Sequence, residues 1–285
     1  MTAYQTLIAV EDLSPRLSDP DWVVVDCRFN LMDTEAGRRA YAEGHIPGAV
    51  YAHLDEDLSG PRGPYTGRHP LPDPSMLARR LGGWGIAQNS QVVAYDDSGG
   101  MFAARLWWLL RWLGHRAVAV LDGGLGEWRR RGLPLSKEMP APQPRTFPLD
   151  HVDTLAWVDS AYVLENLKLG RDLVLDARAA PRYRGEMEPI DPVAGHVPGA
   201  LNLPQDGNLG ADGRFLPADA LRRRFQEVLG QRAPETVLHM CGSGVTACHN
   251  LLAMEVAGLS GSRLYAGSWS EWIRDPQRPI ARGEG

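Results

Sequence analysis

Short apolar runs alternate along this chain with longer stretches of helical periodicity. The runs are WVVVD, VVAY and AVAVL in the first half of the sequence, and LVLD, TVLHM and RLY in the second. Runs that are apolar throughout, with helices between them, are typical of parallel strands covered on both faces. We therefore expect an α/β protein with mainly parallel central sheets flanked by helices. The clearest helical patterns cover 75–82, 102–113, 219–229 and 246–257.

The second half of the chain repeats the first. The motif VVVDCR returns as LVLDAR, GHIPGA returns as GHVPGA, and LDGGLGEW returns as YAGSWSEW. The segment VVAYDDSGGMFAA aligns with TVLHMCGSGVTAC, which places Asp97 opposite Cys241. Four matches in the same order at nearly one spacing indicate two copies of one domain.

The duplication and a proline-rich stretch predict the domain boundaries. LPLSKEMPAPQPRTFP carries five prolines, which cannot continue a helix or a central strand. We assign 135–150 to a linker, 1–134 to an N-terminal domain and 151–285 to a C-terminal domain. Because Asp97 stands at the cysteine position, we expect the N-terminal domain to be non-catalytic.

Composition and charge exclude several classes of function. The net charge of -5 and the pI of about 5.9 argue against nucleic acid and anionic membrane as partners. The most apolar window, RLWWLLRWLG, falls far short of the roughly 20 apolar residues that span a bilayer. The N-terminus has no basic start followed by an apolar stretch, as a signal peptide would, so we expect a cytoplasmic protein.

The three cysteines fit neither a disulfide framework nor zinc-ligand spacing, and we expect no metal and no organic cofactor. Cys27 and Cys248 have the placement of packed thiols. Cys241 opens the loop CGSGVTA, which follows a predicted strand and precedes a predicted helix. Ligand sites in open parallel sheets lie beyond such strand ends.

Two readings of Cys241 are open from this local pattern. Gly242 and Gly244 allow backbone angles at which successive N–H groups point at one sulfur atom, and the positive end of the helix adds to their effect. Such a loop stabilises a thiolate, which is the nucleophilic form of cysteine. The alternative is a small buried thiol beside a turn.

The sequence resembles the rhodanese superfamily, and most closely its tandem-domain sulfurtransferases. The resemblance rests on DCR and DAR at two strand ends, on GHIPGA and GHVPGA, on CGSGVTA and on GSWSEW. It covers nearly the whole chain and implies two tandem rhodanese-like domains, the second of them catalytic through Cys241. The loop itself is similar to that of 3-mercaptopyruvate sulfurtransferases.

The residues after Cys241 discriminate between chemistries. A cysteine phosphatase needs an arginine six positions after its nucleophile, where this chain has Ala247. A thiosulfate-preferring enzyme is expected to place cations directly after the cysteine, where Gly242 and Ser243 are neutral. The loop therefore favours 3-mercaptopyruvate, with a persulfide on Cys241 and release of pyruvate.

The resemblance also implies roles for other residues. It places Ser243 in a proton relay with His69 and Asp55 as partners from the first domain. It assigns Arg182 to the substrate carboxylate, which arginine can grip with two parallel hydrogen bonds. A second family arginine is replaced here by Ile190, and Arg184 is a candidate to compensate. The remaining substrate contacts are assigned to the loop backbone at Gly242, Gly244, Val245 and Thr246.

Two rival functions stay open at this point. A thiosulfate:cyanide sulfurtransferase is disfavoured by the neutral loop and favoured by the missing second arginine. A rhodanese module that carries persulfide sulfur or binds a protein partner is also compatible with the motifs. The sulfur acceptor could be thioredoxin, a small thiol or cyanide, since each supplies a nucleophile for the outer sulfur.

Overall fold

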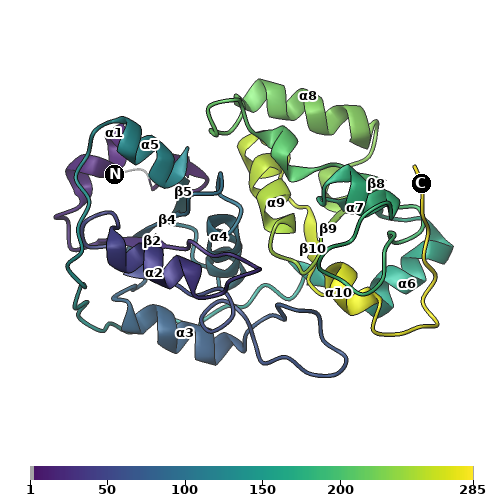
Figure 1. The fold of residues 1–285 in the computed structure, drawn as a ribbon, viewed down its shortest axis with the longest axis horizontal. Coiled ribbons are helices and arrows are strands. Elements are labelled where there is room, and N and C mark those ends of the chain that lie inside the picture. The colour runs from purple at the N-terminus through teal and green to yellow at the C-terminus, as the bar shows by residue number, and fades with distance from the viewer. Residues whose placement is uncertain (1–2, 285) are drawn as a thin grey trace. The chain divides into compact units, whose positions relative to one another are not determined.

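The computed structural model describes residues 3–284, and Figure 1 labels most of their helices and strands. These residues form two compact units, each built around one five-stranded sheet. Each unit also contains one short segment from the half of the chain that otherwise forms the other unit. The first unit contains the residues up to Gly60 with Pro72–Asp153 and Ala211–Phe215, and the second contains Pro61–Leu71, Thr154–Gly210 and the residues from Leu216 onward.

The sheet of the first unit has the strand order β1-β5-β4-β2-β3, and every neighbouring pair is parallel. Its central strand, β4, is buried at all five positions, as a strand covered on both faces requires. The strands are β1 (Leu7–Ile8), β2 (Trp22–Asp26), β3 (Val50–Tyr51), β4 (Gln91–Tyr95) and β5 (Val118–Leu121).

The sheet of the second unit repeats this order as β6-β10-β9-β7-β8, again with every pair parallel. The strands are β6 (Trp157–Val158), β7 (Leu173–Asp176), β8 (Leu201–Asn202), β9 (Val237–Met240) and β10 (Arg263–Tyr265). The prediction of a duplicated α/β fold with parallel sheets is confirmed.

Helices connect the strands in both units. The first unit contains α1 (Val10–Leu13), α2 (Ala36–Glu43), α3 (Pro74–Gly83), α4 (Ala103–Trp112) and α5 (Gly124–Arg130), with a 3₁₀ turn at Ser14–Arg16. The second contains α6 (Ser160–Leu169), α7 (Ala180–Arg184), α8 (Ala218–Leu229), α9 (Ala247–Val256) and α10 (Ser268–Trp272), with 3₁₀ turns at Gln205–Asn208 and Pro234–Thr236. No helix among the described residues is both long enough and apolar enough to cross a membrane.

A buried ion pair lies at the end of the strand beside the central one in each unit, β2 in the first and β7 in the second. Asp26 at the end of β2 accepts hydrogen bonds from the guanidinium of Arg28, which also donates to the carbonyl of Gly44 at 2.9 Å. In the second unit, Arg178 binds Asp176 in the same way and donates to the carbonyl of Gly195 at 2.8 Å. The prediction that these residues tie strand ends to neighbouring loops is confirmed.

The histidines of the two GHxPG motifs have matching structural roles. His45 stacks on Tyr41 with ring centroids 4.0 Å apart, and its Nδ1 lies 2.8 Å from the Tyr41 carbonyl oxygen. His196 stacks on Tyr183 at 3.8 Å and contacts that residue's carbonyl oxygen in the same way. Both rings are fully buried, as expected for hydrogen-bonded structural histidines.

Strand register corrects the alignment of the two loops by one residue. Asp26 pairs with Tyr95 in the first unit, and the equivalent Asp176 pairs with Met240 in the second. The residue that follows each partner is Asp96 in one unit and Cys241 in the other, so Asp97 was the wrong counterpart. The cause is one additional residue in the first loop, which spans 96–102 before α4, whereas the second spans 241–246 before α9.

Asp96 fills its loop with a carboxylate. The side chain is fully buried and accepts hydrogen bonds from the N–H groups of Ser98, Gly100, Phe102 and Ala103 at 2.8 to 2.9 Å. The strand-end loop of this fold can therefore hold an anion on its backbone amides. In the first unit that anion belongs to the chain itself.

Asp96→Ala tests this arrangement. Removal of the carboxylate leaves four N–H groups without their acceptor, so α4 should lose about 2 to 4 kcal/mol of protection. Native-state hydrogen exchange of the α4 amides measures the change. Asp97→Ala is the matched control, because Asp97 is exposed and its removal should stay within about 0.5 kcal/mol. Equal effects of the two variants would contradict the assignment.

The burial of His239 on β9 predicts that the second unit loses folding stability at acidic pH. It is fully buried, and desolvation lowers its pKa from 6.5 to about 3. The unfolded chain therefore binds a proton that the folded chain does not, and stability falls as the pH drops below 6.5. We expect this histidine to account for a loss of about 2 to 3 kcal/mol by about pH 4.5.

The measurement is urea denaturation across this pH range for the wild type and His239→Leu. The variant should lose that part of the pH dependence. His151→Gln, at an exposed histidine, should leave the dependence unchanged. A His239→Leu curve parallel to the wild type would rule out this origin of acid sensitivity.

Candidate active site

Cys241 lies directly beyond the carboxyl end of β9. Its side chain is buried, with 1% of the residue exposed. The loop Gly242–Thr246 separates it from the first residue of α9, Ala247. The loop thus lies at the sheet edge where ligand sites of parallel α/β folds form.

The start of α10 holds the cysteine loop in place. The N–H of Cys241 donates to Ser268 Oγ at 3.1 Å, and the Cys241 carbonyl accepts from the Trp269 N–H at 3.0 Å. The N–H of Ser270 donates to the Gly242 carbonyl at 2.8 Å. Ser268 takes a positive φ of 51°, which is strained for a residue other than glycine.

Gly244 is required by a close approach within this loop. Its φ is +77°, and a Cβ atom there would lie 2.4 Å from the Ala266 carbonyl oxygen. The thiol of Cys248 donates to the Gly244 carbonyl at 3.3 Å, which agrees with a packing role for that cysteine. The carbonyls of Val245 and Thr246 accept the first backbone hydrogen bonds of the helix, from Cys248 and His249.

The structure brings Ser243 and His69 together. His69 Nδ1 lies 2.7 Å from Ser243 Oγ, and both residues are buried. His69 comes from Pro61–Leu71, the segment that belongs to the second unit although it precedes the first unit's α3. A Cβ atom on Gly67 would lie 2.7 Å from the Gly267 carbonyl, so glycine lets this segment approach the turn before α10.

Arg182 on α7 is held by two carboxylates. It donates to Glu188 Oε1 through Nη2 at 2.7 Å and through Nε at 3.0 Å, and Nη2 also lies 3.2 Å from Asp191 Oδ2. Burial raises the pKa of Glu188, but the hydrogen bonds and positive charge of Arg182, together with the N–H groups of Ile190 and Asp191, lower it further than burial raises it. Glu188 is therefore a stable counter-ion that fixes the orientation of the Arg182 guanidinium.

Arg68 is a residue of this site that the sequence patterns did not single out. Its Nη1 forms an ion pair with Asp191, and its N–H donates to Ser270 Oγ at 3.0 Å. A Cβ atom on Gly242 would lie 2.8 Å from Arg68 Nη2 and 3.5 Å from Arg182 Nη2. Two guanidinium groups thus converge on the residue next to Cys241. The adjacent His69 was the one available signal for it in the sequence.

Two other predicted residues have local hydrogen bonds of their own. Arg184 donates from Nε to Glu186 at 2.7 Å, and Glu186 is exposed. Asp55 belongs to the first unit, where its N–H donates to His53 Nδ1 at 3.2 Å. Their assignments to substrate binding and to the proton relay stay predictions.

Comparison with known proteins gives the family. The family model of the rhodanese-like domain matches residues 9–131 and again residues 159–275. These two matches correspond to the two halves of the duplication and cover most of the chain. The chain belongs to the rhodanese-like domain family.

Relatives of this rhodanese-family chain align over nearly its whole length. A protein of Pseudomonas aeruginosa named "Probable 3-mercaptopyruvate sulfurtransferase" is 53% identical over 98% of both chains. The thiosulfate sulfurtransferase of Rattus norvegicus is 32% identical over 99% of this chain and 97% of its own. The crystal structure of SseA from Escherichia coli, described with the rhodanese fold and catalytic mechanism of 3-mercaptopyruvate sulfotransferases, superposes with a TM-score of 0.78 at 29% identity, covering 94% of this chain and all of the other.

One acidic group in this rhodanese-family chain has the geometry of a metal site. Glu35, His53 and Glu56 of the first unit form it, and it is the only such group within residues 3–284. Arg38 binds both glutamates, at 3.1 and 2.7 Å. His53 Nε2 lies 3.0 Å from the Thr34 carbonyl, and its Nδ1 accepts backbone N–H groups. The ion pairs and hydrogen bonds account for this group.

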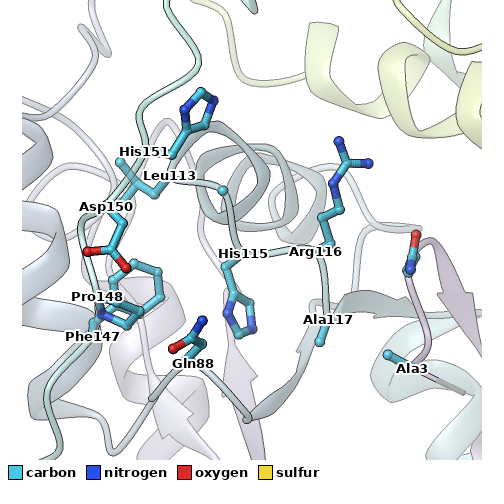
Figure 2. A pocket seen from close by; sticks show the side chains of 12 residues that line it. Ala3, Gln88, Leu113, His115, Arg116, Ala117, Phe147, Pro148, Asp150 and His151 are labelled. Carbon is cyan, nitrogen blue, oxygen red and sulfur yellow. The ribbon is translucent and has the colours of Figure 1, made fainter.

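A pocket of about 400 Å³ lies on the first unit, lined by residues on both sides of the turn before β5 and by the end of the proline-rich segment. Figure 2 shows His115 and Gln88 beside Phe147 and Pro148 in this pocket. His115 packs against Phe147 with ring centroids 5.7 Å apart, and burial lowers its pKa. Cys241 is not among the lining residues, so the pocket is separate from the cysteine loop.

Proposed function

We propose that this chain is a 3-mercaptopyruvate sulfurtransferase that carries sulfur as a persulfide on Cys241. The observation that carries the proposal is the hydrogen-bonded pair of Ser243 and His69 within the loop of a buried strand-end cysteine. The name of the Pseudomonas aeruginosa relative, at 53% identity over 98% of both chains, supports the same activity. Arg182 supplies a cation beside the loop for the carboxylate of the substrate.

The first half-reaction transfers sulfur to the enzyme. The Cys241 thiolate attacks the substrate sulfur, an S–S bond forms, and the C–S bond breaks with its electron pair leaving on carbon as the enolate of pyruvate. The proton of the substrate thiol leaves sulfur, and one proton is delivered to the enolate carbon. The Ser243 hydroxyl and the His69 imidazole form a path for this proton. The products are pyruvate and the Cys241 persulfide.

The second half-reaction regenerates the free thiolate of Cys241. A nucleophilic acceptor attacks the outer sulfur of the persulfide, forms a new bond to it, and releases the Cys241 thiolate. Thioredoxin, a small thiol or cyanide each supplies such a nucleophile. In the first unit, Asp96 occupies the position of Cys241 and the loop amides bind its carboxylate, so we assign turnover to the second unit.

Thiosulfate is the second candidate donor. Arg68 and Arg182 bring guanidinium donors beside the neutral loop, which suits the oxygen atoms of an oxyanion, while Asp191 and Glu188 balance their charge. The thiosulfate sulfurtransferase of Rattus norvegicus is a relative along almost the full chain. The ratio of kcat/KM for the two donors decides between them.

The deciding measurement is kcat/KM for 3-mercaptopyruvate and for thiosulfate at pH 7 to 8, on the wild type and Cys241→Ser. We expect a preference for 3-mercaptopyruvate, and complete loss of turnover in the variant because its hydroxyl cannot carry the sulfur. Mass spectrometry should find one added sulfur atom on the Cys241 peptide of the wild type after donor alone. Cys27→Ser is the matched control and should keep activity. A preference for thiosulfate would replace the substrate assignment and retain the persulfide mechanism.

Ser243→Ala and His69→Asn test the proton path. Each should lower kcat by about 100-fold or more with 3-mercaptopyruvate, since general acid–base assistance contributes about 10²- to 10⁴-fold. The double variant should be little worse than either single variant, because the two groups act as one unit. Turnover with thiosulfate, which has no thiol proton and forms no enolate, should fall much less. Additive losses, or equal losses with both donors, would contradict the relay.

A further inference from the structure

The guanidinium of Arg68 is fixed at the cysteine loop by the fold. Its side chain is 17% exposed, and its partner Asp191 is 3% exposed. The backbone of Arg68 is tied to α10 through Ser270 Oγ, at 3.0 Å. A Cβ atom at Gly242 would lie 2.8 Å from Arg68 Nη2, so the end of this guanidinium packs closely against the glycine.

Arg68 retains hydrogen-bonding capacity that its contacts do not use. Its Nε is buried and has no hydrogen-bond partner among the described residues. An arginine offers five N–H donors in a planar fork that matches a carboxylate, and a buried donor without an acceptor is unfavourable.

Asp191 forms ion pairs with both Arg68 and Arg182. One carboxylate oxygen pairs with Arg68 Nη1, and the other lies 3.2 Å from Arg182 Nη2. The Nη groups of both arginines also face Gly242, the residue after Cys241. Asp191 therefore sets the separation of two cations that point at the same place. A fixed pair of this kind binds an anion with little loss of side-chain entropy.

We propose that Arg68 is a substrate-binding and specificity-determining residue, which with Arg182 grips the carboxylate end of the sulfur donor above Gly242. This rests on the proposed function, because it names the group that holds the substrate of the Cys241 reaction. The selectivity for a charged donor then depends on a segment, Pro61–Leu71, that lies far upstream of the cysteine loop in the sequence. Asp191 acts as a positioning residue for both guanidinium groups.

Kinetics of Arg68→Gln test the binding role. We expect KM for 3-mercaptopyruvate to rise by about 10- to 100-fold with kcat changed by less than about threefold, as for lost charged hydrogen bonds. Arg68→Lys should recover part of the loss, because it restores the charge without the planar fork. Arg62→Gln, at an exposed position of the same segment, is the matched control and should behave as the wild type.

Arg184→Gln tests whether Arg184, and not Arg68, is the second arginine that binds the carboxylate. If Arg184 were the second carboxylate-binding arginine, its variant would raise KM and Arg68→Gln would not, and that result would overturn the proposal. A loss confined to kcat in Arg68→Gln would also overturn it, because a binding cation acts on KM. An unchanged KM in Arg184→Gln together with the raised KM in Arg68→Gln would support it.

A second experiment is independent of sulfur transfer. Iodoacetate and iodoacetamide alkylate the same sulfur and differ chiefly in the carboxylate, so their rate ratio at Cys241 reports on nearby cations. The rates are read by mass spectrometry of the Cys241 peptide in the full chain. Arg68→Gln should lower the iodoacetate to iodoacetamide ratio by about tenfold, with the iodoacetamide rate nearly constant.

The two experiments separate the two proposals. An unchanged ratio in Arg68→Gln, with normal reaction of iodoacetamide, would overturn the role of Arg68 whatever the enzyme's substrate is. A lowered ratio in a protein that releases no pyruvate from 3-mercaptopyruvate would retain the anion-binding role of Arg68 and remove the proposed function. Arg62→Gln again serves as the control and should keep the wild-type ratio.

Discussion

Each unit depends on a buried ion pair between residues two positions apart at the end of the strand beside its central one. Burial of two charges is unfavourable unless their hydrogen bonds are satisfied, and here each guanidinium also binds a glycine carbonyl of the GHxPG turn. In the second unit the chain of contacts continues. Arg178 lies over the ring of Trp269 at 4.9 Å, and the Trp269 N–H binds the Cys241 carbonyl. The ion pair is thus connected through Trp269 to the loop that contains Cys241.

The two strand-end loops show how one backbone arrangement accommodates different chemistry. In the first unit the residue after the strand is Asp96, and its carboxylate takes up four backbone N–H groups. In the second unit the equivalent residue is Cys241, flanked by Arg68 and Arg182. The Asp96 carboxyl is a fixed acceptor whose pKa is raised by burial, whereas the sulfur of Cys241 is the group that we propose accepts and releases another sulfur. The two copies of the fold therefore share this strand-end position and differ in the side chain that occupies it.

Sequence patterns predicted the parts of this protein that local periodicity determines. The helix expected over 102–113 is α4, at Ala103–Trp112, and the parallel strands follow the apolar runs. Edge strands of two residues, such as β3, are too short to produce a pattern. The one-residue error at Asp97 arose because the sequence motif aligns the helices, while the strands fix the true counterpart. Arg68 was missed because its partner Asp191 is 123 positions away, and no local rule connects them.

The exchange of short segments between the units has a consequence for how this chain could be divided. Pro61–Leu71 precedes most of the first unit in the sequence and yet belongs to the second, while Ala211–Phe215 is exchanged in the opposite sense. A polypeptide cut within 135–150 would give a C-terminal fragment that has Cys241 and Ser243 but has neither Arg68 nor His69. The duplication is visible as two consecutive copies, but the unit that contains Cys241 is discontinuous in the sequence. Recombination or truncation at the linker would therefore separate residues that fold together.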